Sequence, residues 1–143
     1  MIQGLAHVGI SVSNLESSVA FYRDLFGMQV AATEERFRGP LFEKLLSLKG
    51  VAGRVVTVGK GGFRLELFEF SHPVPRRQDP RYPVCDQGIT HICLTVTDIE
   101  AEYQRLHAAG VEFHCAPIDF GGIKAVYARD PDGNVIELVD VLT

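Results

Sequence analysis

The stretch GLAHVGISVSNLE at residues 4–16 is the most informative part of the sequence, because a related stretch, GITHICLTVTDIE, follows 84 positions later at residues 88–100. Glycine, histidine, valine and glutamate coincide between the two copies, and most other positions match in apolar or polar character. A second correspondence joins FRLELFE at residues 63–69 to NVIELVD at residues 134–140. Self-similarity at two places in one order predicts that the chain contains two copies of one structural unit.

The two copies define the expected domain organisation. The first module occupies residues 1–70, the second occupies residues 88–143, and residues 71–87 connect them. Four prolines and three arginines fall within residues 71–83. Because proline lacks a backbone N–H and fixes its own φ, this composition predicts an extended connector rather than a helix or a central strand.

Each copy has the pattern strand, helix, strand, strand, strand. Residues 4–12 alternate apolar and polar side chains, as a strand with one buried face does. Ser13 with Glu16, and Thr97 with Glu100, match the capping-box pattern that begins a helix. Glycines then end the two expected helices. The remaining expected elements are strands at 28–33, 54–58, 63–70, 88–96, 111–115, 123–129 and 134–141, and a short helix within the insertion 40–49.

Composition excludes several classes of protein. The chain has 143 residues, of which 46% are hydrophobic, so it can bury a core and is not disordered. A formal charge of −4 argues against nucleic acid or an anionic membrane as partner. No apolar run approaches the roughly 18 residues of a membrane span, and no signal peptide is visible. Three cysteines without a CxxC pair favour a reducing, cytoplasmic setting.

Four polar residues stand on strands at positions opposite the helix-facing side chains. They are His7, Glu66, His91 and Glu137, and they form two register-matched pairs between the copies. A single histidine or glutamate on a strand is usually solvated or hydrogen-bonded. Two carboxylates and two imidazoles among apolar neighbours instead favour a divalent cation as the compensating charge.

Other side chains share these strand faces. Phe68 and Phe70 follow Glu66, and Cys93 follows His91, so these three residues are candidates for lining a substrate pocket. The other three histidines are interpreted as structural: His72 in the connector, His107 on the outer part of a helix and His114 near a strand end.

These motifs resemble the vicinal oxygen chelate superfamily, which includes glyoxalase I, methylmalonyl-CoA epimerase, extradiol dioxygenases, and fosfomycin and bleomycin resistance proteins. The resemblance is carried by LAHVGI (5–10), LEL (65–67), GITHI (88–92) and DPDGNVIEL (130–138). It implies an α+β fold of two βαβββ modules whose curved mixed sheet surrounds a metal site, and a homodimeric assembly. It further implies that His7, Glu66, His91 and Glu137 are the metal ligands.

The resemblance is closest to the metal-dependent glyoxalase-like lyase and isomerase branch. Bacterial glyoxalase I carries an arginine four residues after the first histidine and an asparagine four after the first glutamate. Ser11 and Phe70 occupy those positions here, which argues against binding of glutathione in the same way. Methylmalonyl-CoA epimerase carries glutamine where this chain has Glu66. The substrate is therefore left open by the resemblance.

The donor set predicts a class of reaction. It suits Ni²⁺, Co²⁺, Mn²⁺, Fe²⁺ or Zn²⁺. Four protein ligands on an octahedral ion leave two positions, which suit a small molecule with two adjacent oxygens. Such a metal polarises a carbonyl and stabilises an enediolate or enolate. Glu66 or Glu137 would be the catalytic base, as lyase, isomerase or epimerase chemistry requires.

Two alternatives remain. An Fe(II) extradiol dioxygenase would use His7, His91 and Glu137, although Glu66 would then occupy a position that oxygen needs. A non-catalytic binding or resistance protein would hold a small molecule without turnover. The sequence also leaves open whether the two modules complete a site within one chain or between two chains.

Overall fold

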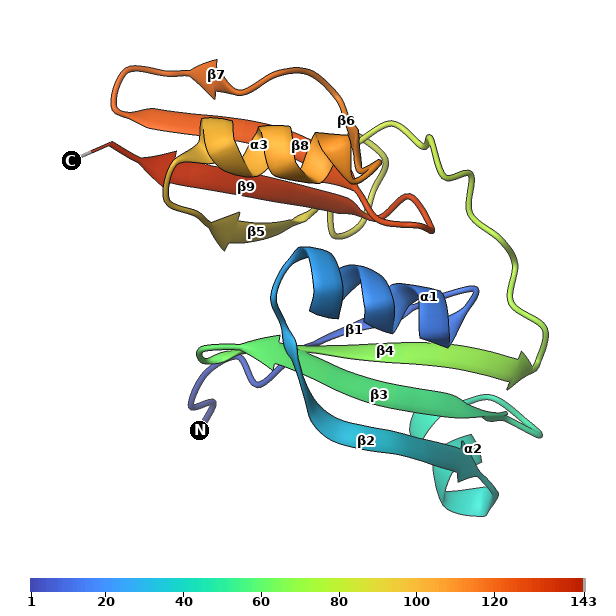
Figure 1. Cartoon of the computed structure of the whole chain (residues 1–143). Coiled ribbons are helices and arrows are strands. Elements are labelled where there is room, and N and C mark those ends of the chain that lie inside the picture. Colours follow the sequence, from blue (N-terminus) through green and yellow to red (C-terminus); the bar gives the residue numbers. More distant parts are fainter. Residues whose placement is uncertain (143) are drawn as a thin grey trace. The chain divides into compact units, whose positions relative to one another are not determined.

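The computed structural model describes residues 1–142. The chain divides into two compact units, Met1–Arg77 and a second unit that begins at Gln78, and each unit has its own sheet and helix (Figure 1). Thr143, the last residue of the second expected module, lies outside the described residues. No helix within residues 1–142 is both long and apolar enough to cross a membrane.

The first unit contains a four-stranded mixed sheet in the order β1-β4-β3-β2. β1 runs parallel to β4, whereas β4, β3 and β2 are antiparallel neighbours. Helix α1 follows β1, and helix α2 lies in the insertion between β2 and β3. The bounds are β1 Val8–Ser11, α1 Leu15–Ala20 with a π-helical turn η1 Phe21–Leu25, β2 Gln29–Arg38, α2 Pro40–Leu46, β3 Ala52–Lys60 and β4 Phe63–His72.

The second unit repeats this topology. Its sheet has the order β5-β9-β8-β6, with β5 parallel to β9, and the short β7 pairs with β8. The α+β class and the repeated strand-helix-strand-strand-strand pattern are therefore confirmed, as two mixed sheets, with the short β7 added in the second unit. The bounds are β5 Ile92–Thr95, α3 Ile99–Ala108, β6 Glu112–Phe113, β7 Ile118–Asp119, β8 Ile123–Arg129 and β9 Val135–Val141.

Each unit buries the helix-facing side of its sheet. In the first unit, Leu65 and Leu67 of β4 are fully buried together with Leu15 of α1. In the second, Ile136 and Leu138 of β9 are buried in the same way. Because strand side chains alternate, the residues between these leucines and isoleucines face the other way. We call this second side, opposite the helix, the inner face of each sheet.

The helices begin one residue later than the capping-box pattern predicts. The caps are Asn14, which accepts from Ser17 N at 2.7 Å, and Asp98, which accepts from Ala101 N at 3.2 Å. Ser13 and Thr97 are therefore not the caps. A further acid on the last strand binds each first helical N–H and fixes this start. Leu15 N donates to Glu69 at 2.7 Å, and Ile99 N donates to Asp140 at 3.1 Å.

Several other boundaries differ from the expectation. The strands expected at 4–12 and 88–96 are only four residues long, because the parallel pairing begins at Val8 with Leu65 and at Ile92 with Ile136. His72 is the last residue of β4 and pairs with Ala52, so it does not lie in an extended connector. β7 was not expected at all, since a two-residue strand carries no periodic signal.

Part of the connecting segment packs on the second unit. Arg129 donates through Nη2 to the carbonyl oxygen of Tyr82 at 2.8 Å, and its guanidinium lies 4.9 Å from the Tyr82 ring centroid. Gly133 approaches the Pro80 backbone so closely that a Cβ would collide with it. Residues 80–82 are therefore held by the β8–β9 hairpin.

The turn of this hairpin depends on Asp130, which is 5% exposed. Its carboxylate accepts from Asp132 N, Asn134 N and Asn134 Nδ2 at 2.8–2.9 Å. We expect Asp130→Ala to lower the free energy of unfolding by about 2–3 kcal/mol, because three part-buried N–H donors lose their acceptor. Urea denaturation measures the change. The control Asp86→Ala alters an exposed loop aspartate and should change little, so an equal loss in both variants would contradict this account.

Candidate metal centre

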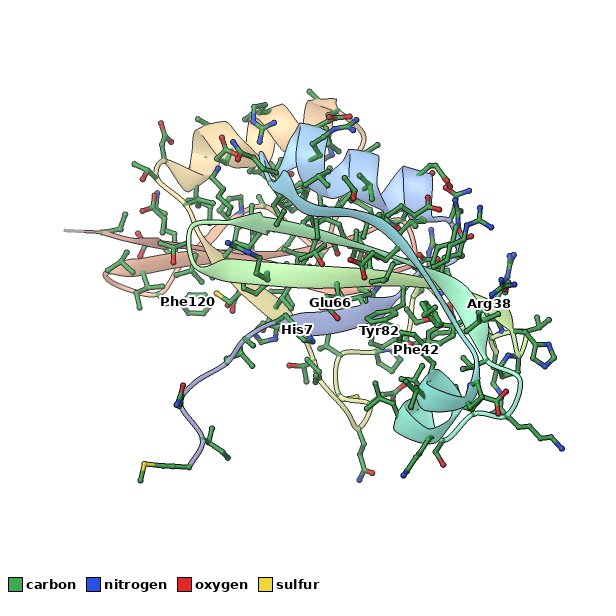
Figure 2. The ribbon with its side chains drawn as sticks, turned by 90° about the horizontal axis from the view of Figure 1, so that it is seen from below. His7, Arg38, Phe42, Glu66, Tyr82 and Phe120 are labelled. Atoms are coloured by element: carbon green, nitrogen blue, oxygen red, sulfur yellow. The ribbon has the colours of Figure 1, made fainter. Side chains whose placement is uncertain are left out.

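The first unit brings His7 and Glu66 together. Glu66 lies on the inner face of β4, opposite Gly9 of β1. His7 immediately precedes β1, and its Nε2 lies 3.3 Å from Glu66 Oε2. Figure 2 shows the two side chains beside each other. The histidine side chain is 47% exposed and the glutamate 28%, so both remain accessible to a ligand.

The second unit builds the same pair from the equivalent elements. Glu137 lies on the inner face of β9, opposite Cys93 of β5. His91 immediately precedes β5, and its Nε2 lies 3.0 Å from Glu137 Oε2. The side chains are 26% and 20% exposed. In both units a parallel strand pair therefore sets the histidine and the glutamate side by side.

Neither pair has a third metal-binding side chain of its own. Within each unit, the described residues offer no group of three histidine, cysteine, aspartate or glutamate side chains placed to hold an ion. Each unit supplies one imidazole and one carboxylate, which is half of the four-ligand set expected from the sequence. A nitrogen and oxygen set of this kind suits borderline or hard divalent ions.

The ring of His91 has hydroxyl neighbours that could orient it. Thr90 Oγ1 lies 2.8 Å from His91 Nδ1, and the Tyr127 hydroxyl lies 3.5 Å from the same atom. In the tautomer that carries its proton on Nδ1, the ring donates to these oxygens and Nε2 is free to bind a metal. Burial raises the pKa of Tyr127, with a further contribution from Glu137, so its hydroxyl keeps its proton at neutral pH.

An aromatic cluster follows Glu66 along the inner face of the first sheet. The Phe68 and Phe70 rings stack with centroids 6.0 Å apart, and both lie against Phe37 of β2 at 5.7 and 5.3 Å. Phe42 of α2 packs on Phe37 at 5.7 Å and is labelled in Figure 2. The insertion between β2 and β3 thus adds an aromatic side chain that the second unit lacks.

The three remaining histidines have other partners, although His114 packs on the Tyr127 ring that also contacts His91. His72 ends β4, and His107 stacks on Tyr103 of α3 with ring centroids 5.5 Å apart. His114 Nε2 lies 3.0 Å from Arg129 Nε. Burial and the charge of Arg129 lower the pKa of His114, which keeps that ring neutral.

Sequence comparison identifies the family. The model of the Glyoxalase/Bleomycin resistance protein/Dioxygenase superfamily matches residues 4–138. The chain belongs to this superfamily. The match covers both units and all four residues of the two His–Glu pairs, so the resemblance seen in the motifs is confirmed.

Named relatives in the superfamily include enzymes. The chain is 30% identical to 2-epi-5-epi-valiolone epimerase from Actinomyces sp over 94% of this chain and 78% of the relative. It is 25% identical to a lactoylglutathione lyase from Haemophilus influenzae over 95% and 91%. A glyoxalase family protein from Bacillus cereus superposes with a TM-score of 0.89 over 100% of this chain and 97% of that one, at 23% identity, which shows the fold.

Tyr127 and Thr90 were not identified from the sequence. Tyr127 pairs with Glu137 across the β8–β9 hairpin, so the position of Tyr127 beside Glu137 follows from the hairpin register. The Asp130–Gly133 turn signal could have set that register in advance, because turn type and strand register are linked. Thr90 has no such signal, since its contact with His91 depends on the backbone just before β5.

Cys93 is the cysteine nearest to the second pair. Desolvation, and then its hydrogen bond to Glu137, raise the pKa of the Cys93 thiol to about 11. A thiolate beside an acceptor carboxylate is unfavourable, so the residue is a thiol at neutral pH even though it is partly open to solvent.

This environment predicts that Cys93 reacts slowly with alkylating reagents. In metal-free protein at about pH 8.5, we expect iodoacetamide to alkylate Cys85 and Cys115 before Cys93, because only thiolate reacts. The Cys93 rate should rise as the pH approaches 11, and Glu137→Gln should raise it at lower pH. Peptide mass spectrometry resolves the three sites. Glu112→Gln is the matched control, and equal rates for all three cysteines at pH 8.5 would contradict the assignment.

Proposed function

We propose that this chain is a metal-dependent lyase or isomerase of the glyoxalase type, which moves a proton next to a carbonyl group in a small molecule. The observation that carries the proposal is the duplication of the His–Glu pair. The same two residue types lie 3.3 Å apart in one unit and 3.0 Å apart in the other. Both pairs also stay partly open to solvent, as side chains that bind a ligand must.

A divalent ion fits these residues. His7, Glu66, His91 and Glu137 would hold it, with two neutral imidazole nitrogens and two carboxylates balancing its charge. The partly exposed side chains leave room for an ion and a substrate. When bound, the ion would act as a Lewis acid toward two adjacent substrate oxygens. Its identity among Ni²⁺, Co²⁺, Mn²⁺, Fe²⁺ and Zn²⁺ is left open by the donor set.

Glu66 and Glu137 are the candidate bases. Each is a carboxylate on an inner sheet face, so either could accept the proton from the carbon next to the substrate carbonyl and return it to the same carbon or to the adjacent one. Epimerisation needs the proton returned to the other side of the same carbon, whereas isomerisation needs it on the adjacent one. Both reactions use the same two carboxylates.

The relatives support proton-transfer chemistry and leave the substrate open. An epimerase and lactoylglutathione lyases are among them. We propose that Phe68 and Phe70 form an apolar wall of the pocket beside Glu66, and that Cys93 lines it beside Glu137. The Phe68–Phe70 stack gives this wall a flat aromatic surface, which suits an apolar substrate group next to the two oxygens.

The proposal includes an assembly and a location. We propose a homodimer, in which the two pairs combine either within each chain or between chains. We also propose a reducing, cytoplasmic setting, which the three free cysteines support.

An activity screen with a matched variant tests the proposed reaction. Metal-loaded protein would be assayed with α-ketoaldehyde thiol adducts, acyl-CoA compounds and catechols. We expect proton exchange with solvent deuterium in one of the first two classes. Glu66→Gln should reduce turnover by about 10²–10⁴-fold, since it removes a general base, while Glu112→Gln should retain it.

Other outcomes of the screen would exclude the proposal. Iron content together with catechol-dependent oxygen uptake would identify a ring-cleaving dioxygenase instead. Tight binding of a small molecule with no turnover in any metal-loaded form would identify a binding protein. Full activity and full metal content in Glu66→Gln would remove Glu66 from both proposed roles.

A further inference from the structure

A pocket of about 460 Å³ lies at the end of the first unit where the β3–β4 hairpin turns. Figure 1 shows this hairpin at the opposite end of the sheet from α2. The pocket is lined by the start of β2, the loop after η1 and the hairpin itself. The lining of the pocket includes Gly27, Gln29, Gly59, Lys60, Gly61 and Arg64.

Two cations line this pocket and no acid does. Within residues 1–142, no ion pair joins Lys60 or Arg64 to a carboxylate. Arg54, in the same sheet, contrasts with them because it binds Glu16, Glu34 and Glu69. In a chain with a net charge of −4, two cations in the lining of one pocket without an acid make a local positive potential.

Arg64 is held in place by the hairpin backbone. Its Nη1 donates to the carbonyl oxygens of Gly61 and Phe63, both at 2.9 Å. The side chain crosses Gly59, where an added Cβ would lie 2.8 Å from Arg64 Cδ. Only glycine leaves this space. The guanidinium is therefore oriented before any ligand arrives, which lowers the entropic cost of binding.

Lys60 reaches the pocket from the other side of the sheet, because it pairs with Phe63 on the helix-facing side. Gly27 has φ +65°, and a Cβ there would lie 3.2 Å from Lys60 Nζ. The ammonium therefore lies close against the backbone that follows η1, on the pocket wall. Guanidinium and ammonium groups bind carboxylate or phosphate oxygens through charge-assisted hydrogen bonds.

Arg64 links this pocket to the His7–Glu66 pair, although neither His7 nor Glu66 lines it. Arg64 is the inner-face residue next to Glu66 on β4, about 7 Å away along the strand. Val8 pairs with Leu65, which puts His7 at the level of Arg64. Phe68 and Phe70 lie on the other side of Glu66. The inner face of β4 therefore carries, in order, a cation, the proposed metal ligand and an aromatic wall.

We propose that Lys60 and Arg64 form an oxyanion-binding subsite that holds a carboxylate or phosphate group of the substrate. The identification of that oxyanion with part of the substrate rests on the proposed function, whereas the binding site itself does not. The substrate class is then an anionic small molecule, with its charged group on the Arg64 side of the two reacting oxygens and its apolar group on the Phe68 side.

Titration of the full-length, metal-free protein with inorganic phosphate and with acetate tests the subsite. Amide NMR spectra should show saturable shifts at Gly27, Gly59 and Gly61. Lys60→Gln and Arg64→Gln should each weaken binding about tenfold or more, as loss of one charge-assisted contact does. Tighter binding of phosphate would assign a phosphate group, and equal or tighter binding of acetate would assign a carboxylate.

Matched variants make the test specific. Lys44→Gln and Arg38→Gln alter exposed cations outside the pocket and should leave the shifts unchanged. Arg64→Lys keeps the charge without the planar fork, so it should bind more weakly than wild type but more tightly than Arg64→Gln. Glu66→Gln should retain phosphate binding, which separates this inference from the metal proposal. The absence of saturable shifts up to about 50 mM of either ion, or identical shifts in Lys60→Gln and Arg64→Gln, would overturn it.

Discussion

Both His–Glu pairs depend on one structural constraint, the parallel pairing of the first and last strands of each unit. Gly9 lies opposite Glu66 in β1–β4, and Cys93 lies opposite Glu137 in β5–β9. Because the histidine stands just before the first strand of each pair, this register sets an imidazole beside a carboxylate. The helix-facing leucines and isoleucines of β4 and β9 are fully buried, so a one-residue slip would turn apolar side chains to the inner face. The hydrophobic core thus sets the strand register that places the histidine beside the glutamate.

This arrangement divides the proposed site between two copies. One imidazole and one carboxylate are too few donors to hold a transition-metal ion tightly, and two such pairs make a common four-ligand set. The copies have also diverged around the shared pair. The first unit adds the aromatic cluster and the Lys60–Arg64 pocket, whereas the second adds Tyr127 and Cys93 beside Glu137. The shared pairs suit the metal, and the differing residues suit recognition of an asymmetric substrate.

The sequence was sufficient for the topology and for the faces on which the paired residues lie, because both follow from a duplicated period-two pattern. It was insufficient where long-range partners decide the local structure. Asn14 and Asp98 cap the helices because Glu69 and Asp140 bind the first helical N–H groups. Those acids are matched in the repeat but carry no local helix signal. The Lys60–Arg64 pocket likewise depends on Gly27 and Gly59, whose closeness to the cations appears only in the folded unit.

Whether the two His–Glu pairs share one metal ion can be measured by the stoichiometry of metal binding. Purified, metal-free protein would be titrated with Co²⁺ and followed by calorimetry and visible absorption, together with His7→Ala and His91→Ala. We expect one tightly bound ion per chain, and loss of tight binding in both variants although each leaves one pair intact. Two independent ions per chain, or a variant that still binds tightly through its remaining pair, would contradict a shared ion.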